Sequence, residues 1–136
     1  MDTNFKHMRY YITKTVSGSF EETESKVRDS LMNNGFGIIT EIDMQEKLKE
    51  KLGVDFKKYS ILGACNPGFA YEAIQHEEHL GVLLPCNVVV MDKGNGETVV
   101  SAIDALTMMQ GIGNPNIEQI ATRINENLTK ALESVK

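Results

Sequence analysis

The two cysteines are the residues of this chain best suited to chemistry. Cys65 lies in the run Ala64-Cys65-Asn66-Pro67, where a predicted strand passes into a predicted helix. The positive end of a helix dipole favours a thiolate and lowers the pKa of a cysteine. A thiol at this turn could react with a ligand or contact one. The alternative is a small apolar residue that fills a tight strand-to-helix turn.

Cys86 opens a later strand, and alternation places it on the same face as Val88 and Val90, which indicates a core position. If the strands of Cys65 and Cys86 are parallel neighbours, the thiols are held roughly 20 Å apart, because one ends a strand and the other begins one. A disulfide needs Cα atoms within about 7 Å. Only an antiparallel arrangement, or a contact across a dimer, would bring these thiols together.

Other polar residues offer alternatives. Glu72, His76 and His79 have the spacing of metal ligands on one helical face, but that face is opposite the apolar stripe, so we expect solvent-exposed side chains and no metal site. Asp104 follows a predicted strand, where a carboxylate serves as a base or ligand or caps the next turn. The glycines form no phosphate-binding loop.

Composition narrows the class of protein. The chain has 136 residues and a formal net charge of −5, which predicts one domain over 1–136 with a structured core over 8–135. The acidic balance and the absence of a basic stripe argue against nucleic acid. No apolar run is long enough for a membrane span, and no signal peptide is apparent. We therefore expect a cytoplasmic protein with free thiols.

The elements that position these residues follow from periodicity and end signals. Strands are predicted over 8–16, 36–42, 59–65, 86–91 and 98–103, after a frayed start at 1–7. Helices are predicted over 19–35, 43–53, 66–81 and from Asn114 onward, with 105–113 irregular. The run Lys93-Gly94-Asn95-Gly96 predicts a hairpin.

The order β-α-β-α-β-α-β-β-α predicts an α+β fold. We expect a compact two-layer sandwich in which helices pack on a mixed sheet of about five strands. The mixed character is expected because the final hairpin must be antiparallel.

Several stretches resemble a known family when taken together: 35–43 running into 48–56, then 59–67, then 81–90. They closely resemble the domain of unknown function 302 family, over about Val16 to Val135. The resemblance implies a bacterial or archaeal α+β domain that tends to form homodimers, with no established reaction. Gly68 and Ala105 depart from the family pattern, and the second leaves the role of Asp104 open. The family signature maps onto Gly63, Cys65, Asn66, Pro67, Leu84, Pro85, Cys86 and Asn87.

Three functions remain open. The first is a homodimeric module that binds a small molecule or ion near the Cys65-Asn66-Pro67 turn, where backbone N–H groups suit an anion. The second is a thiol-dependent enzyme or redox sensor using Cys65, with or without Cys86. The third is a dimeric interaction protein without chemistry, using Met108, Met109 and residues 80–84 as its surface. No cofactor is indicated, and the candidate ligand-binding residues are Cys65, Asn66, Pro67, Cys86, Asn87 and Asp104.

Overall fold

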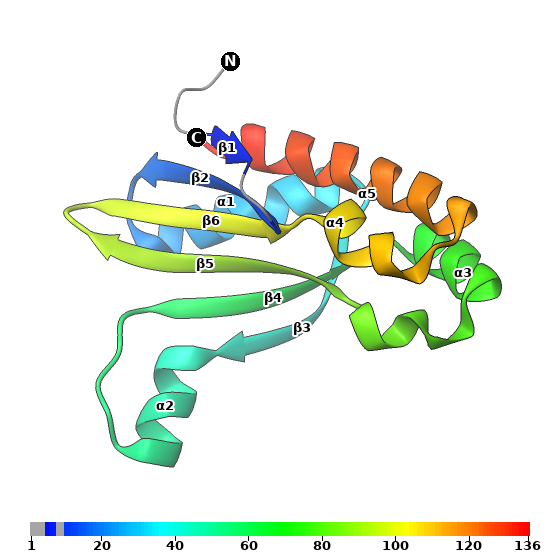
Figure 1. Ribbon diagram of the computed structural model, residues 1–136. Coiled ribbons are helices and arrows are strands. Elements are labelled where there is room, and N and C mark those ends of the chain that lie inside the picture. Colours follow the sequence, from blue (N-terminus) through cyan, green and yellow to red (C-terminus); the bar gives the residue numbers. More distant parts are fainter. Residues whose placement is uncertain (1–4, 8–9) are drawn as a thin grey trace.

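The computed structural model describes residues 5–7 and 10–136. One sheet carries a layer of helices on a single face (Figure 1). The strands are β1 Phe5–His7, β2 Tyr11–Ser17, β3 Gly37–Asp43, β4 Tyr59–Cys65, β5 Cys86–Gly94 and β6 Glu97–Ile103. The helices are α1 Phe20–Asn33, α2 Met44–Leu52, α3 Pro67–His76, α4 Ala105–Met109 and α5 Pro115–Glu133, with the 3-10 helices η1 Glu78–Leu83 and η2 Gln110–Ile112.

The expected α+β class is confirmed, but the sheet differs in two ways. It has six strands, in the order β1-β2-β6-β5-β4-β3, because residues 5–7 pair with β2 rather than forming a frayed start. Every strand pair among the described residues is antiparallel, so the expected mixed sheet is wrong. The connections through α2 and α3 are long enough for parallel crossovers, but each returns the chain to an antiparallel neighbour.

The predicted ends of the elements are largely confirmed. Ser19, Asp43 and Asn66 cap α1, α2 and α3, and each side chain accepts a hydrogen bond from a backbone N–H of the first turn. The hairpin turn has positive φ at Asn95 and Gly96, which its residue types allow. Met8 and Arg9 of the predicted first strand lie outside the described residues, and the strand itself runs over Tyr11–Ser17.

Two predicted boundaries are wrong. The helix expected to reach Gly81 ends at His76, and a 3-10 turn follows. The stretch expected to be irregular begins with α4, which Asp104 caps. In both places a short side-chain cap stabilises a turn that hydrophobic periodicity does not reveal.

The core lies between the sheet and the helical layer. Alternate strand residues face α1 and α5, whose own apolar stripes complete it. Its fully buried members include Leu31, Leu62, Val88, Val90, Val100, Ile117, Leu128 and Leu132. No helix in the described part of the chain is long and apolar enough to cross a membrane.

Candidate functional site

The second face of the sheet, here called the open face, is apolar although the main helices pack against the other side. Register and alternation place three rows of side chains on it. The first row contains Tyr11 and Ile103. The second contains Thr13, Ser101, Val89 and Ile61. The third contains Thr15, Val99, Met91 and Tyr59. An antiparallel sheet with a solvated face ordinarily presents polar residues there. The apolar rows therefore mark a surface suited to contact with something other than water.

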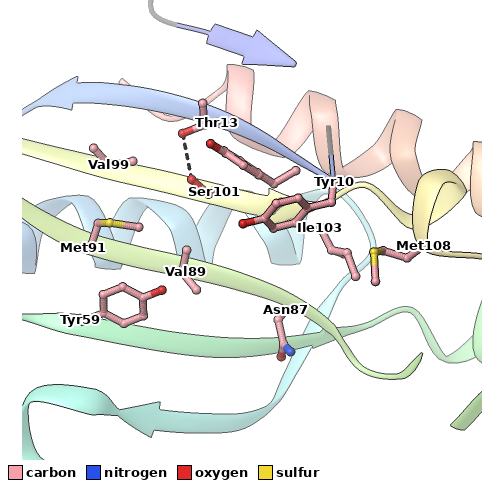
Figure 2. Close-up of a pocket in the computed structure, with 12 residues that line it drawn as sticks. Tyr10, Thr13, Tyr59, Asn87, Val89, Met91, Val99, Ser101, Ile103 and Met108 are labelled. Carbon is pink, nitrogen blue, oxygen red and sulfur yellow. Dashed lines mark hydrogen bonds between the residues drawn. The ribbon is translucent and has the colours of Figure 1, made fainter. Parts of the chain in front are cut away.

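A pocket of about 520 Å³, here called the open-face pocket, lies on these rows (Figure 2). Tyr10 and Met108 stand at one end, and Tyr59 and Met91 at the other. The rings of Tyr10 and Tyr11 meet edge to face with centroids 4.8 Å apart. The full lining is Tyr10, Tyr11, Thr13, Tyr59, Asn87, Val89, Met91, Val99, Ser101, Ala102, Ile103 and Met108.

Ser101 and Thr13 form the polar centre of the open-face pocket. Ser101 Oγ donates to Thr13 Oγ1 at 2.8 Å, as Figure 2 shows. Thr13 Oγ1 in turn donates to the backbone oxygen of Val100 at 3.3 Å. Ser101 is only 8% exposed, so its hydroxyl is a buried polar group in a largely apolar surround. Such a group orients a ligand in an otherwise apolar site.

A second, smaller cavity of about 270 Å³, here called the thiol pocket, lies where β4 ends, β5 begins and α3 starts. Its walls are almost entirely apolar. Three of the predicted site residues line it, namely Cys65, Asn66 and Cys86, whereas Pro67 does not. The other lining residues include Phe36, Phe69, Leu80, Leu84, Pro85, Met109 and Ile124.

The two cysteines lie on antiparallel neighbouring strands, which is the arrangement that brings them close. Cys86 pairs with Ala64, the residue directly before Cys65. Cys65 is the last residue of β4, and both cysteines line the thiol pocket. Both cysteines are free.

Their environments differ as well. Cys86 is buried in the core, as alternation predicted. Burial, with a smaller contribution from Cys65, raises the pKa of the Cys86 thiol to about 11. Cys65 is only partly buried. Of the two, Cys65 is therefore the thiol that a reagent or ligand can reach.

The helix N-terminus beside Cys65 is capped by the side chain of Asn66. Asn66 Oδ1 accepts from the backbone N–H of Phe69 at 3.0 Å. This cap occupies a donor that an anion would use, so the geometry favours an apolar ligand over an ion in the thiol pocket. Asn87 lies apart from this turn and lines the open-face pocket.

Asp104 belongs to a separate cluster. Its buried carboxylate accepts from Thr107 N at 3.0 Å and Asn125 Nδ2 at 2.8 Å, and it pairs with His7 Nε2 at 2.5 Å. Burial raises the pKa of Asp104, but the hydrogen bonds from Thr107, Asn125 and His7 outweigh it and hold the pKa below its ordinary value. Its contacts are those of a structural cap on α4.

The weak metal candidates do not assemble. α3 ends at His76, so His79 lies in η1 rather than on the same helix. Glu72 pairs with Arg123 at 3.1 Å. The described residues contain no cluster of three or more side chains able to hold a metal ion.

The pocket residues on the open face were not predicted as a site. The available signal was that the runs 86–91 and 98–103 are apolar on both faces, whereas a sheet covered on one face needs only one apolar face. Lys14 was also missed. It is 2% exposed, and its Nζ donates to the backbone oxygen of Glu133 at 3.0 Å.

Fold and cavities together define a small α+β domain with an apolar pocket on the open face of an antiparallel sheet. The family described as "Domain of unknown function DUF302" matches residues 12–135, and the chain belongs to that family. A similar solved structure is titled "Crystal structure of uncharacterized conserved protein DUF302 from Bacillus stearothermophilus". It is 30% identical, with a TM-score of 0.87 over 95% of this chain and 100% of that one. No curated protein matches the chain.

Proposed function

We propose that the protein is a small-molecule-binding module and that its ligand occupies the open-face pocket. The observation that carries this proposal is an apolar hollow of about 520 Å³ with a few polar groups at its centre. Ligand sites in proteins have volumes of roughly 300–1,000 Å³ and this balance of lining residues. The thiol pocket, at about 270 Å³, falls below that range.

Methionine methyl groups offer a direct test, because different methionines report the two pockets. Met91 and Met108 line the open-face pocket and Met109 lines the thiol pocket. Met32 on α1 is 67% exposed and lines neither pocket, so it serves as the internal control. The protein carrying 13C-methyl methionine is titrated with a fragment collection of neutral and charged rings. Bound fragments are expected to shift the Met91 and Met108 signals, and fragments that shift neither would contradict the proposal.

The thiol pocket is the second candidate site, because three residues predicted from sequence meet around it. A ligand there would shift Met109 and would protect Cys65 from alkylation. Thiol catalysis has less support than binding. The residues that line this pocket, among those the structure describes, include no histidine, amine or carboxylate to act as a base.

We also propose that the protein forms a homodimer through the segment 44–58, here called the arm. α2 extends from the β3 edge of the sheet (Figure 1), and no residue of the arm is buried. Leu52 and Phe56 are exposed on it. Five lysines and three acidic residues give the arm +2, so the rest of the −5 chain carries −7. A second copy therefore offers the arm a surface of opposite net charge.

Native mass spectrometry of protein purified without reducing agent tests the dimer and reads any retained ligand. Wild type is expected at the dimer mass, and Leu52→Glu with Phe56→Ser at the monomer mass. Val82→Ser is the matched control, because Val82 is 85% exposed but lies in η1, outside the arm. A monomeric wild type, or a dimer that survives the arm substitutions, would overturn this interface.

A further inference from the structure

The open-face pocket has no ionic lining. Its residues, within the described chain, are apolar, aromatic, hydroxyl or amide side chains. A charged ligand group in such a site would lose water without gaining a counter-charge, which disfavours its binding. The chain as a whole carries −5, which adds long-range repulsion of anions. The lining therefore favours an uncharged ligand.

The pocket is also long and has a flat floor. Tyr11 on β2 and Tyr59 on β4 lie on strands about 14 Å apart at the usual strand spacing, with β6 and β5 between them. Between them the floor is the pleated surface of β5 and β6, with Val89 at its centre (Figure 2). Tyrosine rings and methionine sulfurs at both ends provide contacts that aromatic rings favour. This shape fits a flat aromatic molecule that lies along the sheet.

At the centre of the floor, the hydroxyl of Ser101 determines whether a ligand must donate or accept a hydrogen bond. A hydroxyl has one proton to donate and two lone pairs to accept. The proton of Ser101 is committed to Thr13 Oγ1, and the proton of Thr13 to the carbonyl of Val100. Ser101 Oγ therefore meets the pocket as an acceptor. A ligand that satisfies it must bring an O–H or N–H donor.

We propose that the open-face pocket takes an uncharged, flat aromatic molecule bearing a hydroxyl or N–H group, which donates to Ser101 Oγ. This inference rests on the proposed function, since it names the ligand class of the same site. The proposal requires that Ser101 donates to Thr13 and that Thr13 donates to the Val100 carbonyl when the ligand is bound. Removal of the Ser101 or the Thr13 hydroxyl is then expected to change the preference of the pocket for ligands that donate a hydrogen bond.

The test uses three probes that share one ring system. 2-Naphthol is neutral at neutral pH and has a donor, 2-methoxynaphthalene is neutral and has none, and 2-naphthoate is charged. Binding is measured by the shifts of the Met91 and Met108 methyl signals and by calorimetry. 2-Naphthol is expected to bind about five-fold more tightly than its methyl ether, the value of one net hydrogen bond. 2-Naphthoate is expected to bind at least about ten-fold more weakly than 2-naphthol.

Two variants identify the group that discriminates. Ser101→Ala is expected to remove the preference for 2-naphthol while leaving the affinity for 2-methoxynaphthalene within about two-fold. Thr13→Val removes the acceptor of the Ser101 proton, so Ser101 can donate to the pocket, and the preference is expected to shift toward the ether. Thermal unfolding verifies that both variants fold. If one variant does not fold, the other still tests the donor requirement independently.

The outcomes separate this inference from the proposed function. Equal binding of 2-naphthol and its ether at Met91 and Met108 would overturn the donor requirement and leave the open-face pocket as a binding site. Preference for 2-naphthoate would overturn the neutral class. Shifts at Met109 alone would place binding in the thiol pocket and overturn both. If the naphthalenes shift no methyl signal but other fragments shift Met91 and Met108, the aromatic class is wrong and the site remains.

Discussion

Asn125 on α5 binds both sides of the turn at Asp104. Its Nδ2 donates to Asp104 Oδ1 at 2.8 Å, while its Oδ1 accepts from the backbone N–H of Ala105 at 2.7 Å. One amide side chain thus joins the end of β6, the start of α4 and the long C-terminal helix. His7 of β1 reaches the same carboxylate, which ties the edge strand to this junction. The cluster lies close in the chain to the open-face pocket, since Ile103 and Met108, on either side of Asp104, line that pocket.

Asp104→Asn is expected to lower the free energy of unfolding by about 1–2 kcal/mol at neutral pH, through loss of charge-assisted hydrogen bonds. The hydrogen bonds from Thr107, Asn125 and His7 hold the pKa of Asp104 below its ordinary value in the folded protein. Its stabilisation is therefore fully present above the ordinary pKa of an aspartate and is lost as the pH falls through the lower folded pKa. Urea unfolding at neutral pH and at pH 3 measures both effects.

The matched control for this substitution is Asp55→Asn. Asp55 pairs with Lys49 at 3.0 Å, but its side chain is 94% exposed. Exposed pairs contribute little, so this variant is expected to stay within about 0.5 kcal/mol of wild type. A difference between wild type and Asp104→Asn that is as large at acid pH as at neutral pH would mean that ionisation of Asp104 does not stabilise the fold.

Lys14→Met is expected to destabilise the fold, although methionine is the more apolar residue. Lys14 Nζ donates to the carbonyls of Glu133 and Val135, which the end of α5 leaves without helical partners. Loss of these buried bonds costs about 1–3 kcal/mol. Chemical denaturation measures the change. Lys26→Met, which removes an exposed bond to Lys136, is the control and is expected to have little effect. Equal stability of Lys14→Met and wild type would contradict this account of the C-terminal end of α5.

The two thiols are expected to react at very different rates. With a pKa of about 11, Cys86 has about one part in a thousand as thiolate at pH 8, and it is 4% exposed. Iodoacetamide is expected to label Cys65 in the native protein and both cysteines in urea. Cys65→Ser should then show no native labelling, and mild oxidation should leave the mass of the denatured wild-type chain unchanged. A loss of two daltons within one chain would contradict this prediction and show that Cys86 can be oxidised together with Cys65.

The α+β class could be predicted from the sequence because its signals are local. Caps such as Ser19, Asp43 and Asn66 and the turn at Asn95-Gly96 act within a few residues. Strand direction is not local. A helix-containing connection permits either a parallel or an antiparallel return, so β4 and β5 could not be oriented from their own residues. The pairing of β2 with β6 of the hairpin is likewise determined by residues that lie far apart in the chain.

The candidate site was partly predictable for the same reason. Cys65, Asn66 and Cys86 do meet, around the thiol pocket, because the turns that hold them adjoin in the sheet. The open-face pocket depends on which strands become neighbours and on which face the helices cover. Its tyrosines lie on β2 and β4 or beside them, far apart in the chain. Alternation shows that these residues share faces, but not that one face lacks a helical cover.

Gly63→Ala is expected to be among the most destabilising single-methyl additions in this fold. A Cβ at Gly63 would lie 2.0 Å from Thr40 Oγ1 and 2.7 Å from Pro85 Cγ. The first contact is with a side chain of the edge strand β3 and the second with the residue that precedes β5, so the side chains of Thr40 and Pro85 must both move. Overpacking of this kind costs about 1–3 kcal/mol. Thermal and urea unfolding measure the loss.

A double substitution identifies the source of the strain. Thr40→Ala removes the nearest obstructing atom, so Gly63→Ala with Thr40→Ala is expected to recover part of the stability that Gly63→Ala loses. The rest of the loss is expected to remain, because the contact with Pro85 is unchanged. Gly81→Ala is the control, because nothing lies within 4 Å of a Cβ at Gly81. That variant is expected to unfold at the wild-type midpoint or above it, since alanine restricts the unfolded chain. If Gly63→Ala were as stable as Gly81→Ala, Thr40 and Pro85 would have to yield at no cost, and the close approach of β3 to β4 would not constrain residue 63.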